Sequence, residues 1–100
     1  MASVKLTKAE IVETIAEKSG VNKKDIHFIV DSIFEEIRQA LLGDKIVELR
    51  GFGTFEIRTR KGRQKARNPK TGETIQVSDH GVAVFRPGKD LKESAWALRN

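Results

Sequence analysis

The chain has 100 residues, no cysteine and a formal net charge of +5. A chain of this length forms one domain, so we expect a single domain over residues 1–100, and the absence of cysteine excludes disulfides and thiolate metal sites. The first residues lack the apolar core of a signal peptide and no run reaches the roughly 20 apolar residues of a membrane span, so we expect a cytoplasmic protein.

The first two elements are predicted to be helices. Thr7 followed three residues later by Glu10 is a capping box before apolar residues at helical spacing, and Gly20 is expected to end this helix. A second helix is expected to begin near Asn22, to carry one apolar stripe, and to end at Gly43.

From residue 45 the apolar period changes to two, which predicts strands. Val47 and Leu49 share one face, and after a tight connection at residues 51–53 the side chains of Phe55 and Ile57 are expected to point inward. A return strand is expected to contain Val82, Val84 and Phe85, with a bend or bulge allowed by Gly81, and a short helix is predicted for residues 89–98 after Pro87-Gly88.

These elements predict an α+β fold. It has two N-terminal helices, a three-stranded antiparallel sheet with a long protruding β-ribbon arm at about residues 58–75, and a short C-terminal helix. Little in the arm can be buried, and an isolated two-stranded ribbon is marginal in water. We therefore expect its tip to be mobile until it meets a partner.

The positive charge is concentrated in that arm. Seven cations and no acid occupy residues 58–70, which leaves 12 of the 19 cations against 14 acids elsewhere, a net of −2. A slightly acidic body with one strongly basic arm indicates a polyanionic partner. The seven are Arg58, Arg60, Lys61, Arg63, Lys65, Arg67 and Lys70.

The core is predicted to be too small for a monomer. Without the arm only about 80 residues remain to build it, and chains of that size often need oligomerisation. Phe52, Phe55 and Phe85 are expected to cluster at the base of the sheet as the core of an obligate dimer. The alternative is that they are ordinary intrachain core residues. We expect a homodimer, with a heterodimer as the alternative.

Pro69 is predicted to lie at or next to the apex of the arm, because Asn68-Pro69 favours a turn and Gly72 tolerates positive φ. A proline ring is rigid and apolar and has no N–H to desolvate. Such a ring can enter between stacked base pairs while flanking arginines reach phosphates and the minor-groove floor. The alternative is that Pro69 only shapes the loop.

Other classes of function have less support. His27 and His80 lie on different elements without a third ligand, so no metal site is expected, and no catalytic motif, cofactor or small-molecule substrate is indicated. A structural RNA-binding module would need aromatic side chains among the basic ones to stack unpaired bases, and residues 58–74 contain none. Trp96 is interpreted as a packing or subunit anchor, with a stacking platform as the alternative.

The stretch GFGTFEIRTRKGRQKARNPKT, Gly51 to Thr71, resembles the signature of the bacterial histone-like DNA-bending family that includes HU and integration host factor. The segments Leu6–Glu10, Phe34–Arg38 and Phe85–Lys89 agree with the same family, so the resemblance covers nearly the whole chain. Apolar wedges in the minor groove are an established feature of this family.

The resemblance implies an intertwined dimer whose two arms wrap double-stranded DNA, with Pro69 intercalating and Arg67 and Asn68 beside it. It also implies a nucleoid-associated protein and phosphate contacts at helix starts, for which the matching residues are Lys8, Lys89 and Lys92. Each of these lysines has the alternative of a solvated surface charge.

Two positions bear on how closely the chain follows the family. Most members have glycine where this chain has Ala66, which slightly restricts the backbone before the tip. Glu48 and Arg50 resemble a pair that takes part in site recognition in one subunit of integration host factor. Their alternative role is an exposed ion pair worth under about 1 kcal/mol.

Overall fold

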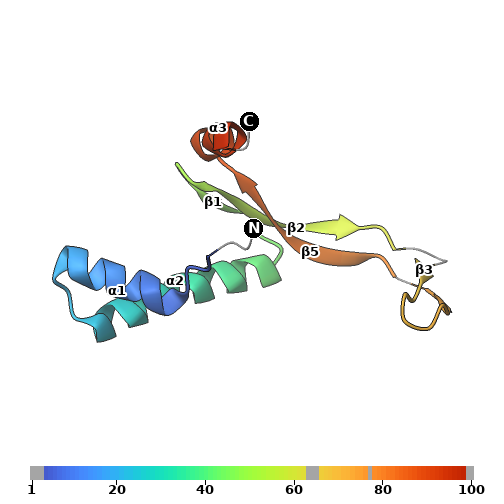
Figure 1. Ribbon diagram of the computed structural model, residues 1–100, viewed down its shortest axis with the longest axis horizontal. Coiled ribbons are helices and arrows are strands. Elements are labelled where there is room, and N and C mark those ends of the chain that lie inside the picture. The colour runs from blue at the N-terminus through green and yellow to red at the C-terminus, as the bar shows by residue number, and fades with distance from the viewer. Residues whose placement is uncertain (1–3, 63–65, 77, 99–100) are drawn as a thin grey trace. The chain divides into compact units, whose positions relative to one another are not determined.

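The computed structural model describes residues 4–62, 66–76 and 78–98. Its elements follow in the order α1, α2, β1, β2, β3, β4, β5, α3 (Figure 1). The helices, the antiparallel three-stranded sheet and the C-terminal helix confirm the predicted α+β class. By its internal contacts the chain divides into two compact units, Met1–Gln39 and Ala40–Asn100.

Helix α1, Lys8–Ser19, begins and ends at the predicted caps. The Thr7 side-chain oxygen accepts the backbone N–H of Glu10 at 3.3 Å, and the Thr7 hydroxyl donates to the Glu10 carboxylate at 3.2 Å. Gly20 adopts φ 72° and donates its N–H to the Ala16 carbonyl, which closes the last turn. The capping pattern in the sequence therefore located both ends of this helix.

Helix α2, Lys23–Leu42, also begins where predicted, since the Asn22 side-chain oxygen accepts the Lys24 N–H at 2.8 Å. At its other end the left-handed residue is Asp44, with φ 57°, and not Gly43. Asp44 and Lys45 donate their N–H groups to the carbonyls of Leu41 and Ala40. Aspartate tolerates this conformation better than most residues. The helix end predicted at Gly43 therefore lies one residue before the observed left-handed residue, Asp44.

The first unit has a small core. Val12 of α1 packs with Ile26 and Val30 of α2, and these are its buried apolar side chains among the described residues. Other members of the same α2 stripe, Ile33 and Phe34, are about half exposed. The stripe of α2 is therefore wider than α1 covers.

In the second unit the strands β1 (Val47–Leu49), β2 (Gly53–Arg60) and β5 (His80–Pro87) form one antiparallel sheet in the order β1-β2-β5. The register places Phe55 opposite Phe85 and Ile57 opposite Ala83 on one face of the sheet. Val82 and Val84 of the return strand lie opposite Arg58 and Glu56, on the other face. The pairing is regular through Gly81, which lies opposite Thr59, so the bend or bulge expected there is absent from the β2–β5 ladder.

Gly53 is required by the close approach of β5. A Cβ at this position would lie 2.4 Å from Cε1 of Phe85 and 2.6 Å from the backbone oxygen of Arg86. The preceding turn is closed by the Phe52 N–H, which donates to the Leu49 carbonyl, and by Gly51 at φ 84°. The sequence predicted a tight connection here, and the contact with Phe85 explains which glycine cannot be replaced.

The three predicted phenylalanines lie together in the second unit. The ring centroids of Phe52 and Phe85 are 5.2 Å apart and those of Phe55 and Phe85 are 4.8 Å apart. Phe52 nevertheless remains 50% exposed. The cluster thus forms within one chain but is incompletely covered there, and its role as a dimer core stays a prediction.

Helix α3, Lys89–Leu98, follows β5 directly, as predicted from Pro87-Gly88. Its first turn is closed by the Lys92 N–H, which donates to the Gly88 carbonyl at 2.9 Å. Trp96 and Leu98 on this helix are highly exposed, so Trp96 is not a packing residue within its own unit. Within the described residues, no helix is long and apolar enough to cross a membrane.

Candidate nucleic-acid interface

The arm is built from two ladders. The pairing of β2 with β5 extends to Arg60 opposite His80, and beyond it β3 (Ala66–Arg67) pairs with β4 (Thr74–Ile75). Between the two ladders the Asp79 carboxylate accepts the Gly62 N–H at 2.8 Å. The two strands of the predicted ribbon are thus connected on both sides of the residues that the structure does not describe.

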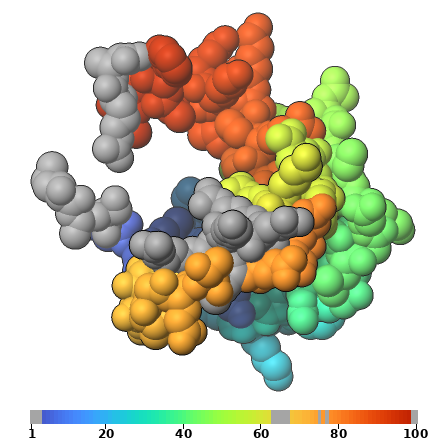
Figure 2. All heavy atoms as spheres, turned by 90° about the vertical axis from the view of Figure 1, so that its right-hand side faces the viewer, coloured from blue at the N-terminus to red at the C-terminus, as the bar shows by residue number. Residues whose placement is uncertain are grey.

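The tip is a closed turn that runs from Asn68 to Glu73. The Asn68 N–H donates to the Glu73 carbonyl at 2.8 Å, and the Asn68 carbonyl accepts the Gly72 N–H at 2.7 Å, with Gly72 at φ 75°. Pro69 is exposed within this turn, and Figure 2 shows the segment, in gold, at the molecular surface facing the viewer. The predicted turn and its positive-φ glycine are confirmed, while mobility of the tip stays a prediction.

The predicted arm cations are placed as follows. Arg58 and Arg60 are exposed near the end of β2, Lys61 follows them, and Lys70 is exposed in the tip. The backbone of Arg67 pairs with Thr74 in the β3–β4 ladder. Arg63 and Lys65 lie outside the described residues, as does Val77. The described cations therefore follow the ribbon from its base to its tip.

Sequence reasoning missed the part played by Glu56, which lies between the two residues, Phe55 and Ile57, that were expected to point inward. Its carboxylate accepts hydrogen bonds from Arg58 on the same strand and from Arg86 of β5, the latter at 3.1 Å, and only 13% of its side chain is exposed. The hydrogen bond from Arg58 lowers the pKa of the Glu56 carboxyl, against the opposing effect of desolvation, and Arg86 lowers it further. Arg58 is therefore tied to the base of the arm.

This lowered pKa predicts a pH dependence of stability. Because the pKa of Glu56 is lower in the folded chain than in the unfolded one, its ion pairs stabilise the fold at neutral pH, and that contribution is lost as pH falls through the folded value. We expect the melting temperature of Glu56→Gln to lie below that of the wild type at pH 7. The gap should begin to narrow near the ordinary glutamate pKa of about 4.3 and close below the lower pKa of the folded chain.

Thermal unfolding followed by circular dichroism from pH 7 to pH 2.5 measures this convergence. Glu48→Gln is the matched control, since it removes an acid from the neighbouring strand that has no ion pair among the described residues. An unchanging gap between wild type and Glu56→Gln over the whole range would contradict the assignment.

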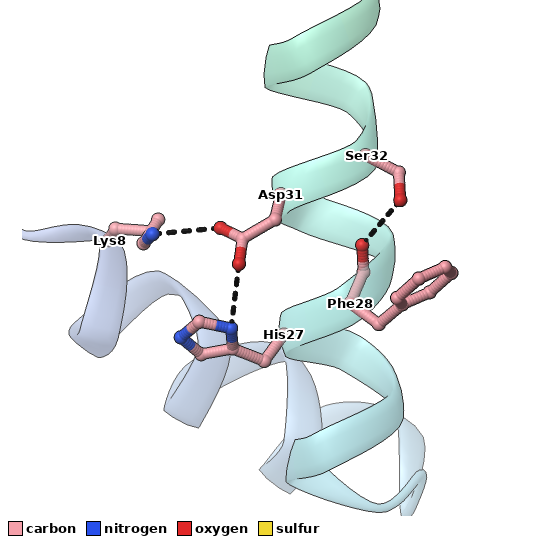
Figure 3. Close-up of polar contacts among 5 residues, drawn as sticks. All are labelled: Lys8, His27, Phe28, Asp31 and Ser32. Atoms are coloured by element: carbon pink, nitrogen blue, oxygen red, sulfur yellow. Dashed lines mark hydrogen bonds and ion pairs between the residues drawn. The ribbon is translucent and has the colours of Figure 1, made fainter.

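Lys8, predicted to contact phosphate, is engaged within the first unit. Its ammonium donates to Asp31 of α2 at 2.8 Å, and His27 Nδ1 lies 3.0 Å from the other carboxylate oxygen (Figure 3). The hydrogen bond from Lys8 lowers the pKa of the Asp31 carboxyl, and the proximity of His27 acts in the same direction. Lys8 lies at the first position of α1 and is about half exposed.

The other predicted body residues lie in the second unit. Lys89 and Lys92 are exposed in the first half of α3. Glu48 and Arg50 border a small hollow of about 190 Å³ that Gly53 and Gly88 also line. Glu48 and Arg50 form no ion pair with each other among the described residues, so the structure does not support the alternative of a simple surface ion pair.

Within the part of the chain that the structure describes, no group of three histidines, cysteines or acids is placed to hold a metal ion. His27 faces Asp31, as Figure 3 shows, and His80 begins β5 with its Nδ1 2.9 Å from the Ser78 carbonyl. Both histidines thus have local polar partners on the chain. What the arrangement offers chemically is a cationic ribbon with the apolar ring of Pro69 exposed in the turn at its tip.

Comparisons with known proteins agree with this geometry. The family model described as bacterial DNA-binding protein matches residues 6–95. The chain is 52% identical over 87 residues to integration host factor subunit alpha of Pseudoalteromonas translucida, covering 87% of each chain. It is 49% identical to the same subunit of Pseudomonas aeruginosa, covering 87% of this chain and 86% of that one.

Solved structures give the same result. The Anabaena HU–DNA cocrystal structure matches with a TM-score of 0.82 and 38% identity, over 90% of this chain and 97% of that one. HU from Thermotoga maritima matches with a TM-score of 0.63 and 32% identity, over 90% and 98% of the two chains. With a cationic ribbon, a proline-bearing tip and sequence matches over most of its length, the chain belongs to the bacterial DNA-binding protein family of HU and integration host factor.

Proposed function

We propose that this protein is an architectural DNA-binding protein that bends and compacts double-stranded DNA through the minor groove. The observation that carries the proposal is the arm, a basic ribbon that ends in a closed turn with Pro69 exposed. Each of two arms in a dimer places its Pro69 ring between base pairs at a kink, while the arm cations neutralise phosphates. We propose no catalytic role and no small-molecule substrate.

The charges are sufficient for such a deformation. Each arm carries seven cations, and if about eight to ten phosphates are neutralised per dimer, log K should fall with log salt with a slope of roughly −7 to −9. Bending a short duplex sharply costs on the order of 1–10 kcal/mol. Contacts in that number offset such a cost.

The dimer is supported by apolar surface that neither unit covers internally. Ile33 and Phe34 in the first unit, and Phe52 and Trp96 in the second, are each about half exposed or more. The relatives from Pseudoalteromonas and Pseudomonas are named subunits of a factor, which supports an assembly of more than one chain. We propose a homodimer, with a heterodimer as the alternative, in which residues 1–100 act as a single DNA-binding domain.

In this proposal the body also binds DNA. Lys8, Lys89 and Lys92 contact phosphates near helix starts, and Lys8 would exchange Asp31 for a phosphate. The protein would act in the cytoplasm as part of the nucleoid. A site-preferring bender is the second candidate, because the relatives above are integration host factor subunits and Glu48 and Arg50 border an open hollow.

The proposal is tested by measuring bending and affinity together. We expect fluorescence energy transfer between the labelled ends of an intact or nicked DNA duplex to rise on saturation, and an RNA duplex of the same sequence to be bound more weakly without bending. Random and candidate-site duplexes at fixed salt separate broad from site-preferring binding. Unchanged transfer at saturation, or equal affinity for A-form RNA without bending, would contradict DNA bending and favour an RNA-binding module.

A further inference from the structure

Asn68 uses almost all of its polar groups inside the tip. Besides the two backbone hydrogen bonds described above, its side-chain Oδ1 accepts the Lys70 N–H at 2.9 Å. Because Lys70 contributes a donor, the atom that meets it must be the amide oxygen and not the amide nitrogen. Only the NH₂ group of the side chain is therefore left to contact anything outside the turn.

The hydrogen bonds that Asn68 accepts connect it to residues on the far side of Pro69 in the sequence. Proline has no N–H to close a turn, so the first donor after it is Lys70, and Asn68 Oδ1 takes that donor across the ring. The Asn68 carbonyl then takes Gly72 N–H over the wider turn, and Thr71 Oγ1 accepts Glu73 N–H at 3.3 Å. The backbone donors of Lys70, Gly72 and Glu73 are thus satisfied within the tip, and the Pro69 ring is left outside it.

The local bonds matter because the described part of the arm gives the turn a short support. Among the described residues the adjoining β3–β4 ladder has two residue pairs, Ala66 with Ile75 and Arg67 with Thr74, and a short isolated two-stranded ribbon is marginal in water. A tip that already has its bound shape loses less conformational freedom on binding. Asn68 is the residue that contributes three of the hydrogen bonds that fix this shape.

We propose that Asn68 is a positioning residue, whose side-chain oxygen holds the turn so that Pro69 stays exposed at the tip. This inference rests on the proposed function, since it concerns how the intercalating Pro69 ring is positioned. It assigns to the Asn68 oxygen a role within the arm and not a contact with a base or a phosphate.

The experiment compares Asn68→Ala with two variants that keep an oxygen at this position and lack the NH₂ group. Asn68→Asp keeps the acceptor in nearly the same shape, and Asn68→Ser provides a shorter acceptor that closes the same turn more weakly. Pro69→Ala serves as the reference without a wedge. All four variants are made in the full chain, and an unchanged melting temperature shows that the body is intact.

The first measurement uses the protein without DNA. Amide hydrogen exchange of Lys70 by NMR should be faster in Asn68→Ala by a factor of about five, as expected for the loss of one intramolecular hydrogen bond. It should stay near the wild-type rate in Asn68→Asp and lie between the two in Asn68→Ser. Equal exchange of Lys70 in wild type and Asn68→Ala would overturn the inference, whatever the DNA results.

The second measurement is the bend of a duplex at saturating protein. Asn68→Ala should bend DNA as little as Pro69→Ala, whereas Asn68→Asp and Asn68→Ser should recover at least half of the difference. Asn68→Asp should do so with weaker affinity, because it adds a negative charge beside phosphates. If both oxygen-bearing variants bend DNA no more than Asn68→Ala, the NH₂ group is what matters and the inference is wrong.

Failure of the proposed function would look different. If Pro69→Ala bends DNA like the wild type, the wedge is disproved, although the exchange data would still show whether Asn68 holds the turn. If Pro69→Ala loses bending while Asn68→Ala keeps it, the wedge stands and the positioning role of Asn68 is overturned.

Discussion

Pro69→Ala should bend DNA much less than the wild-type protein while binding it almost as tightly. We expect the bend to fall by at least about 20° per kink, the lower end of the range that inserted apolar wedges produce. The Kd should rise by less than about tenfold, because phosphate contacts supply most of the affinity and Pro69 contributes none of them. Energy transfer between duplex ends, with a titration at the same salt, measures both quantities.

Arg67→Ala is the matched control at the same tip, since it removes a cation and keeps the ring. It should weaken affinity and bending together and make the salt slope shallower by about one unit. A Pro69→Ala protein that bends DNA normally would show that the proline only shapes the loop.

Gly53→Ala should destabilise the sheet strongly. The new Cβ would overlap both the Phe85 ring and the backbone oxygen of Arg86, and the backbone atom cannot move without shifting β5. Overpacking of this kind costs typically about 1–3 kcal/mol and sometimes more. Because Phe85 also contacts Phe52 and Phe55, we expect the proposed dimer to weaken with the sheet.

Urea unfolding and sedimentation at several protein concentrations test this expectation. Gly81→Ala is the control on β5, where a Cβ would meet the Ile57 Cγ2 methyl at 3.0 Å and no backbone atom within 4 Å. It should lose clearly less stability than Gly53→Ala. Equal stability of the two variants would show that the Phe85 cluster tolerates displacement and does not hold the sheet together.

The position of each helix followed from short-range chemistry. Thr7, Gly20 and Asn22 cap helices through bonds to residues two to four positions away, and such bonds can be read from spacing alone. The end of α2 was the exception, because Gly43 and Asp44 are both able to take the left-handed conformation and the sequence offers no rule that chooses between them. The prediction placed it on the more common residue.

The interface was predictable in its charge and not in its internal contacts. The run of arm cations and the Asn68-Pro69 turn could be recognised from residue types alone. The resemblance to HU and integration host factor added candidate DNA-binding residues in the body. Lys8 appeared to be an available cation, yet it is bound to Asp31, which lies 23 residues away in the chain. Sequence spacing carries no signal for such a pair, because it depends on how α1 and α2 pack.

The sequence by itself determined the order of the elements, the separation of a basic arm from a slightly acidic body, and the family. Each of these depends on residue type and on neighbours within a few positions. Only the tertiary structure decided that Glu56 binds both Arg58 and Arg86, the latter 30 residues after Glu56, and that Gly53 must leave room for the Phe85 ring. Both depend on the β2–β5 register, which pairs residues at least 20 positions apart, so the spacing of near neighbours does not reveal either contact.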